Sequence, residues 1–548
     1  MKKGFLRGLF SQRVLNWIGV GLLAACYVIS LQRVFHIRSQ ADDKEVVTIR
    51  LAHWQLESGM RQAITDVAAA YTKLHPNVRI EQLPVPERVY STWLVTQLIG
   101  GTAPDLIELG GTSLTDEYLA RYFQPITEEV EKPNPYNAGT PLEGRKWRDT
   151  FLDGMNGAPA YNGNLLEFYG AGPAMVTIRL YYNKDLFAKA LGPDAPPPDT
   201  YERFIDACKK LEAYGDKRGV PLVPLAGSAY NGPLMMGRLF SSQTQRWNLE
   251  NDDLLDMKST ADMSRIWLSL AYLQGRWSLK TPSFDSGISL EHDVSQYMQS
   301  GFMQVQRDDA TFYFLQQRSA MIATGSWDVE SFRSQASFPI GICNIPLPGR
   351  DNPKYGAGVL GQFSEASTST SACFGLTRTS PHSAEALDFL RFLTSRTGVD
   401  LFCRTSHWLP GVEGVPVPES VKDFAPVLDG YPGGPGLTVG ADTTRIATSQ
   451  FYLLGGDGDA VEAYRRGLDQ AGFHAAVLSD LQRGYRILAQ TMQRGDVAYG
   501  ALLRGRREGN LPGAERKFAE LNRKQDDSAI LNYRTARGLA AVHESPEQ

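Results

Sequence analysis

The sequence predicts an α/β protein of two lobes, with an N-terminal membrane anchor and a helical C-terminal extension. Three observations predict this organisation. An uncharged apolar run, residues 14–31, follows a cluster of basic residues. Strand-like and helix-like segments then alternate over roughly 400 residues, a pattern typical of mostly parallel sheets covered by helices. From about residue 471 onward only helical periodicity is left.

The N-terminal segment, residues 1–40, has the features of a membrane anchor or export signal. The apolar run would form a helix about 27 Å long, close to the thickness of a bilayer core. The basic residues before it predict that the start stays in the cytoplasm and the bulk lies outside. A second interpretation stays open, because Leu23–Ala24–Ala25–Cys26 resembles a lipoprotein cleavage box with Cys26 as the lipidated residue. The apolar residues after Cys26 favour the uncleaved helix.

The first lobe begins with a βαβ unit. Residues 46–51 are β-rich, and apolar residues recur at helical spacing over 60–74. A second strand follows at 78–80, then a helix over 90–99 and a strand over 105–109. This order predicts a mostly parallel sheet.

The same pattern returns later in the chain. Residues 176–182 are strand-like, and Thr200 is a suitable N-cap for the helix that follows it. The last segment, 471–548, predicts a helical extension that packs on a lobe or serves as a docking element for a membrane partner.

Composition excludes several functional classes. Lys and Arg number 56, Asp and Glu 60, and the net charge is −4, so the basic excess expected of a nucleic-acid-binding protein is missing. The five cysteines form no CxxC pair, which argues against a zinc site. They are expected to be buried thiols, although a pair such as Cys343 and Cys373 could bridge in an oxidising compartment. We expect no metal and no cofactor.

Catalytic signatures are missing as well. The sequence contains no HExxH, no GxSxG elbow and no Walker A loop. Paired carboxylates of a glycoside hydrolase stay open, because their pairing is spatial and leaves no sequence motif.

Four segments, in this order, resemble family 1 bacterial extracellular solute-binding proteins, the group that includes the maltose-binding protein. The resemblance covers roughly residues 46–470. The segments are 48–109 with His75–Pro76–Asn77–Val78 and Gly101–Thr102–Ala103–Pro104–Asp105–Leu106, then Tyr181–Tyr182–Asn183–Lys184–Asp185–Leu186–Phe187, then Ala320–Met321–Ile322–Ala323–Thr324–Gly325–Ser326–Trp327, and finally Pro346–Leu347–Pro348–Gly349 with the helix 384–395.

The resemblance implies a type II periplasmic-binding-protein fold, with the solute-binding domain over 41–470. Lobe 1 would comprise about 46–175 and 338–405, and lobe 2 about 178–335 and 408–470. The lobes would hinge near 175–180 and 336–342 and close on a ligand.

The function that the resemblance implies is that of an extracytoplasmic receptor rather than an enzyme. It would deliver a small solute, for which we expect a carbohydrate, to the membrane subunits of an ABC-type permease. The alternatives are an extracytoplasmic carbohydrate-active hydrolase and a ligand sensor without transport.

Candidate ligand-binding residues lie where strands end, because strand carboxyl ends face the crevice of open α/β sheets. A sugar needs flat apolar faces and a few polar groups, and the candidates supply both. We expect Trp54 and Trp327 to come from opposite lobes and to meet across the ligand. For the two glutamates a solvated surface role is the alternative. The polar stretch 356–371 is expected to be an added loop at the cleft rim. The predicted ligand-binding residues are Trp54, Gln55, Glu57, Glu108, Tyr230, Asn231 and Trp327.

Overall fold

The computed structural model describes residues 46–493 and 512–523, except 57, 111–113, 158, 164, 252–260, 367–369, 457 and 514, together with a few residues between 21 and 33. The predicted anchor at 14–31, including Cys26, lies almost entirely outside the described residues. Among the helices of the described part, none combines the length and the apolar character needed to cross a membrane.

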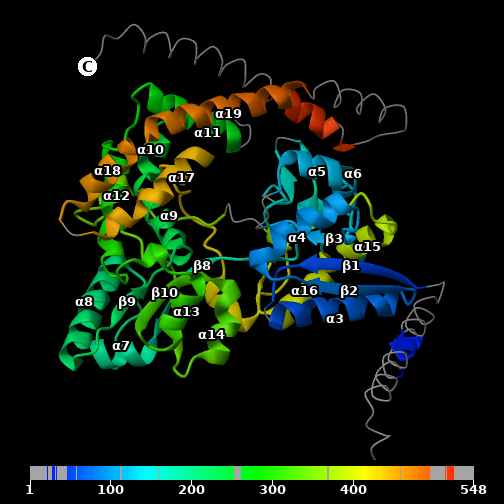
Figure 1. Cartoon of the computed structure of the whole chain (residues 1–548), viewed down its shortest axis with the longest axis horizontal. Helices are drawn as coiled ribbons and strands as arrows, with labels where there is room; N and C mark the ends of the chain where they lie inside the picture. Colours follow the sequence, from blue (N-terminus) through cyan, green and yellow to red (C-terminus); the bar gives the residue numbers. More distant parts are fainter. Residues whose placement is uncertain are drawn as a thin grey trace, which may run out of the picture.

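Two lobes lie side by side and are joined by a few chain crossings (Figure 1). The sheet of lobe 1 has the order β2-β1-β3-β13-β6, in which β1, β2 and β3 are parallel and β13 is antiparallel to both of its neighbours. These strands are β1 (Val47–His53), β2 (Val78–Pro84), β3 (Leu106–Glu108), β13 (Phe374–Leu376) and β6 (Gly170–Ala171).

Both faces of this first sheet are covered by helices. Successive side chains of a strand point to opposite faces, so neighbouring residues pack against different helices. Leu51 and Leu106 pack with helices α3 (Ser58–Leu74), α15 (Ser383–Leu393) and α16 (Arg396–Ser406). Their neighbours Ala52 and Ile107 pack on the other face against α4 (Glu87–Gly100). The predicted order of strands and helices over 46–109 is confirmed.

The sheet of lobe 2 has the order β11-β8-β10-β9. All seven residues of its strand β10 are buried, as expected for an apolar run in a central strand. Thr200 caps α8 as predicted, since its hydroxyl accepts from the Arg203 N–H at 3.3 Å. The strands are β11 (Ile340–Cys343), β8 (Ile178–Asn183), β10 (Ser319–Gly325) and β9 (Val223–Ala226), and helices around them include α7 (Lys184–Leu191), α8 (Tyr201–Arg218), α9 (Asn231–Gln243), α12 (Pro282–Ser295), α13 (Arg307–Leu315) and α14 (Val329–Gln335).

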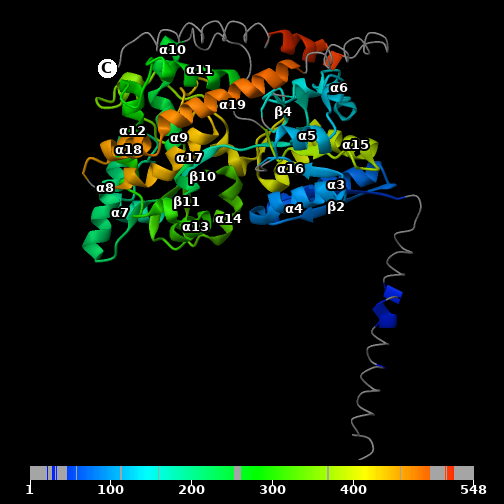
Figure 2. The ribbon, with the colours of Figure 1, turned by 45° about the horizontal axis from the view of Figure 1, so that its top comes forward.

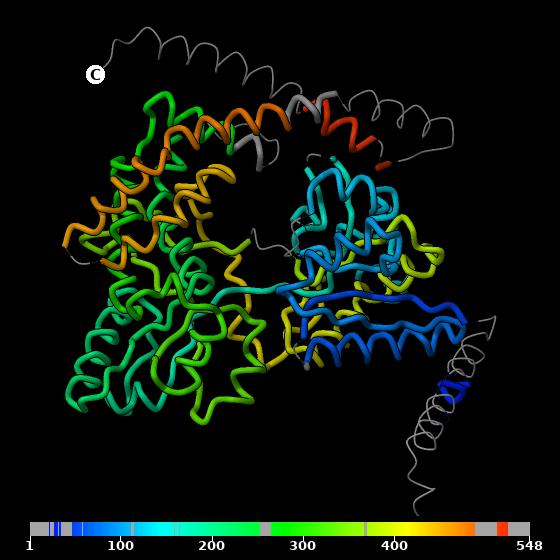
Figure 3. The backbone as a smooth tube through the Cα atoms, in the orientation of Figure 1, coloured from blue at the N-terminus to red at the C-terminus, as the bar shows by residue number. Residues whose placement is uncertain are grey.

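Figure 3 shows the chain passing between the lobes. The strands β12 (Thr370–Ser371), β7 (Ala174–Met175) and β14 (Leu409–Pro410) form a small antiparallel sheet there. We call it the hinge sheet. Its central strand β7 pairs with both β12 and β14. In the described part of the chain, three segments therefore pass between the lobes through this sheet.

The second crossing differs from the sequence-based expectation, which placed it near 336–342 and resumed lobe 1 at 338. Instead β11 pairs with β8 from Ile340↔Asn183 to Cys343↔Leu180, so this segment stays in lobe 2. Gly341 leaves room for the Tyr182 ring on the paired strand, because a Cβ at that position would lie 2.0 Å from the ring. The chain next reaches lobe 1 at β12.

The described residues of the polar stretch, 356–366 and 370–371, are largely packed rather than forming a loop at the cleft rim. Gly358 lies against the backbone of Gln243 in lobe 2, where a Cβ would be 2.1 Å from the Gln243 carbonyl oxygen. Glu365 is buried in an ion pair with Arg179. Of this stretch, Ser371 lines the cavity between the lobes.

The described cysteines Cys208, Cys343, Cys373 and Cys403 are free thiols. Cys343 lies in β11 of lobe 2, whereas Cys373 is buried in the core of lobe 1. The bridge that the sequence left open between Cys343 and Cys373 is therefore not formed in this structure.

The C-terminal segment contacts both lobes (Figure 2). Helix α19 (Phe473–Gln493) buries Phe473, Val477 and Leu481 in the core of lobe 2. Residues 512–523 lie on lobe 1, where Lys517 forms an ion pair with Glu167 and Leu521 packs on Leu166. The helical extension thus packs on more than the one lobe that the sequence predicted.

Candidate functional site

A cavity of about 230 Å³ lies between the lobes. Residues at the end of β1 form one wall and residues of lobe 2 form the other. Ser371 of the hinge sheet, with Val176 and Trp408 next to its strands, completes the lining. The lining residues are Trp54, Gln55, Leu56, Glu87, Val176, Tyr230, Arg307, Trp327, Ser371 and Trp408.

The wall from lobe 1 is held by a buried glutamate. Glu108, 1% exposed, accepts from the Trp54 backbone N–H at 3.3 Å and from Gln55 Nε2 at 2.8 Å. The ring of Tyr90 meets the Trp54 indole edge-on at 5.1 Å, and its hydroxyl donates to the Glu108 carbonyl at 3.1 Å. Glu108 therefore lies behind the wall and positions Trp54 and Gln55, whereas the sequence predicted that it contacts the ligand.

The wall from lobe 2 is aromatic and carries a cation. Trp327 lies two residues after the end of β10, and its ring lies edge-to-face with Tyr230 at 6.4 Å. The guanidinium of Arg307 lies 5.0 Å from the centre of the Tyr230 ring and donates to Asp328 at 2.8 Å. Burial by itself would lower the pKa of Arg307, but the Asp328 carboxylate raises it, so this group stays charged.

An ion pair joins the two walls at the rim. Glu87, the first residue of α4, lies 3.7 Å from Arg307, the first residue of α13. Glu87 is 68% exposed, so the pair contributes little to stability. The position of the pair is more informative than its energy, because it shows that the lobes are in contact on one side of the cavity.

The predicted residues fall into three groups. Trp54, Gln55, Tyr230 and Trp327 line one cavity, and the two tryptophans come from opposite lobes. Asn231 is buried away from it, where its amide donates to the Ala323 carbonyl at 2.8 Å and fixes the start of α9. Glu57 lies outside the described residues.

Sequence reasoning missed six lining residues. Trp408 left a signal, because it is an aromatic residue directly before the strand-like Leu409–Pro410 segment. For Glu87 and Arg307 the sequence gives no such signal beyond their position at the start of helices, since only the approach of the lobes brings them together. The missed residues are Leu56, Glu87, Val176, Arg307, Ser371 and Trp408.

The cavity suits a small, partly polar molecule. Three indoles and a phenol offer flat apolar faces, while Gln55, Glu87 and Arg307 offer hydrogen-bond donors and acceptors. Its volume is slightly below the roughly 300 Å³ at which ligand pockets usually begin. Separation of the lobes would enlarge it.

Comparison with known sequences identifies a family. A family model described as bacterial extracellular solute-binding protein matches residues 66–427. A curated relative, the putative ABC transporter periplasmic-binding protein YcjN of Escherichia coli K12, is 24% identical over 221 residues. That match covers 39% of this chain and 46% of the relative, so it spans less than half of the relative's length.

Solved structures with the same fold include sugar-binding proteins. A structure from work on xylan utilization by Caldanaerobius polysaccharolyticus has a TM-score of 0.53 at 18% identity and covers 77% of this chain and 99% of its own. A chitin oligosaccharide binding protein has a TM-score of 0.52 at 17% identity, with coverage of 78% and 99%. The protein RafE in complex with raffinose has a TM-score of 0.50 at 16% identity, with coverage of 78% and 100%. These matches confirm the predicted two-lobed α/β fold.

Proposed function

From the premise that this chain belongs to the bacterial extracellular solute-binding proteins, we propose that it captures a carbohydrate between its lobes and delivers it to an ABC-type permease. The observation that carries the proposal is that Trp54 and Trp327, from opposite lobes, line the same cavity. A pyranose ring between two indoles would bury its C–H faces on both sides.

Polar groups around the cavity support a carbohydrate ligand. Gln55 is fixed by Glu108 and Arg307 by Asp328, so both would meet sugar hydroxyls in a set orientation. Preorganised groups lose little conformational freedom on binding. The structural neighbours named for chitin oligosaccharide and raffinose point to the same ligand class.

Capture would involve movement of the lobes about the hinge sheet. Short antiparallel strands, two residues each, join the lobes at β7, β12 and β14. Ligand would enter with the lobes apart, and the Glu87–Arg307 pair would form as they close. The predicted N-terminal helix at 14–31 would keep the receptor close to the permease.

A thermal-shift screen of the full chain tests the proposal. The panel contains xylo-oligosaccharides, chitin oligosaccharides and raffinose, with amino acids and short peptides as non-carbohydrate solutes. A ligand at a hundredfold excess over its Kd stabilises the folded state by about 2.7 kcal/mol, which raises Tm. We expect a carbohydrate to give this shift in the parent and not in a Trp54→Ala/Trp327→Ala double variant.

Chromatography of the same mixtures separates receptor from hydrolase. Recovery of intact carbohydrate supports a receptor. Cleavage of the bound sugar, or a shift with non-carbohydrate solutes alone, contradicts the proposal.

A further inference from the structure

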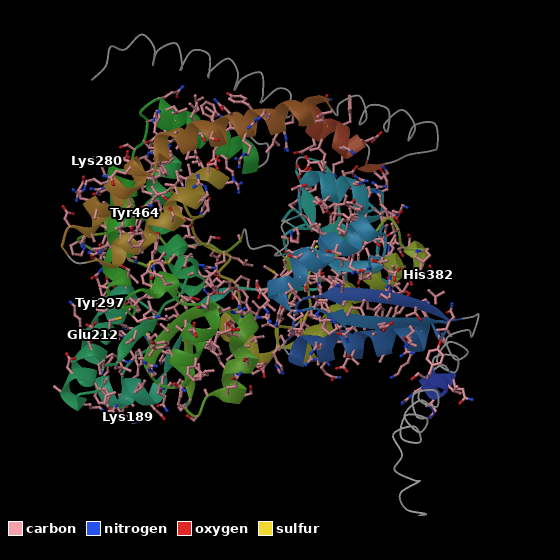
Figure 4. The ribbon with its side chains drawn as sticks, in the orientation of Figure 1. Lys189, Glu212, Lys280, Tyr297, His382 and Tyr464 are labelled. Atoms are coloured by element: carbon pink, nitrogen blue, oxygen red, sulfur yellow. The ribbon has the colours of Figure 1, made fainter. Side chains whose placement is uncertain are left out.

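A second cavity lies within lobe 2, away from the interlobe site. Its volume is about 370 Å³, and it lies among α9, α12, α17 (Ala441–Gln450), the turn after α17 and α18 (Ala460–Gln470). Tyr464, one of its lining residues, is labelled in Figure 4. Most of the lining is apolar or aromatic, including Met236, Phe240, Leu437, Phe451 and Tyr464.

One buried carboxyl group, that of Glu291, lines this cavity. Glu291 is 6% exposed, and among the described residues no hydrogen bond or ion pair reaches its carboxyl group. Burial alone raises the pKa of Glu291 well above its usual value. A buried carboxyl group without a partner is costly, which makes the position unusual for a purely structural residue.

The other ionisable residues of α12 show the contrast. Each of them has a partner, namely Asp285 with Arg465, His292 with the Leu454 carbonyl and Asp293 with Lys354. Glu291 differs because it faces the cavity rather than a neighbouring side chain. The titratable group that interacts with it is Tyr464, whose own pKa is raised by burial and then by the Glu291 charge.

We infer that this cavity binds a small organic ammonium ion, with the cationic group against Glu291 and the apolar body against the aromatic rings. A cation would supply the missing counter-charge and would also be attracted by the faces of Phe240, Phe451 and Tyr464. Hydroxyl groups of Thr444 and Thr448 in the lining can accept the remaining ammonium hydrogen bonds.

Binding would release a proton. In the empty cavity burial favours the protonated form of Glu291, because it raises the pKa of the carboxyl group. An arriving ammonium ion stabilises the carboxylate, so the Glu291 proton passes to the buffer while the ligand keeps its charge. Calorimetry in two buffers of different ionisation enthalpy measures this proton.

Gly237 allows the cavity to be filled by substitution. It lies in α9 on the cavity lining, and a Cβ there would meet no atom within 4 Å. We expect Gly237→Leu to fill part of the cavity, and leucine favours the helix over glycine.

The test uses titration calorimetry of the full chain with 2-phenylethylamine and with its neutral isostere 2-phenylethanol. We expect the amine to bind with proton release and at least tenfold more tightly than the alcohol. Glu291→Gln should weaken the amine at least tenfold and leave the alcohol unchanged. Gly237→Leu should abolish binding of both. Glu250→Gln, at the exposed end of α10 (Gln245–Glu250), is the matched control and should bind like the parent.

Several results would overturn the inference: no amine binding at millimolar concentration, equal binding of amine and alcohol, or parent-like amine binding by Glu291→Gln or Gly237→Leu. The inference is independent of the proposed carbohydrate site. Amine binding should persist in Trp54→Ala, and the carbohydrate shift should persist in Glu291→Gln.

Discussion

Removal of the Glu365 carboxylate should destabilise the protein far more than removal of a surface carboxylate. Glu365 and Arg179 are 3% and 1% exposed and form two parallel contacts of 3.0 Å each. Glu365 also accepts from the Val427 N–H at 3.0 Å and contacts Arg238. One carboxylate thus ties β8 to the two later segments that lead into and out of lobe 1.

The expected magnitude follows from these contacts. Glu365→Ala leaves the Arg179 guanidinium buried without its counter-charge, and breaking a buried pair in this way costs about 3–5 kcal/mol. Arg179 keeps hydrogen bonds to main-chain carbonyls, such as that of Ala425 at 2.7 Å. We therefore expect the free energy of unfolding to fall by about 3 kcal/mol, the lower end of this range.

Equilibrium unfolding in urea measures the loss. The matched control is Asp206→Ala, which removes a surface pair with Lys210 and should cost at most about 0.5 kcal/mol. A double variant, Arg179→Met/Glu365→Leu, should recover much of the lost stability because neither charge is left unpaired. A Glu365→Ala loss no greater than that of Asp206→Ala would refute the reasoning.

Three further predictions concern the site, pH and the C-terminal segment. Trp54→Ala and Trp327→Ala should each weaken carbohydrate binding at least tenfold, about 1.4 kcal/mol, by titration calorimetry, and parent-like affinity in both would exclude the two-walled site. Burial lowers the pKa of His53 to about 4, so below pH 6.5 the unfolded chain takes up the proton first and the folded state loses stability. This contribution amounts to about 2 kcal/mol between pH 7 and pH 5, and His53→Gln should reduce the slope of unfolding free energy against pH; an unchanged slope would contradict it. Lys517→Ala should speed hydrogen exchange over 512–523, whereas Arg523→Ala, which removes a pair within that segment, should not; equal rates in both would show that the Glu167 contact does not hold the segment.

Local sequence patterns were enough to predict most of the helices and strands. The βαβ unit over 46–109 was predictable because apolar residues at i, i+3 and i+4 mark the helix face, and the β-rich runs mark strands. The true course of the chain over 336–342 was not predictable, because β11 pairs with β8, a strand about 160 residues earlier in the sequence. No local pattern distinguishes a strand that stays in a lobe from one that leaves it.

The site was predictable where residues follow strands and unpredictable where it depends on the lobes meeting. Trp54 and Trp327 were found because each lies within two residues of the end of a strand. Glu87 and Arg307 were missed because they belong to helices of different lobes. Glu108 and Asn231 were assigned to the ligand site from the sequence because their side chains are polar. In the structure these side chains form hydrogen bonds to main-chain groups of the protein instead.

Hydrogen exchange of the full chain, with and without the carbohydrate that most raises Tm, tests the central claim most directly. Binding between the lobes should slow exchange in both walls at once, over 52–56 and over 326–328, and in the crossing segment 174–178, which begins with hinge-sheet strand β7. Protection of one wall alone, or protection confined to the lobe 2 cavity among α9, α12 and α17, would show that the carbohydrate does not bind between the lobes.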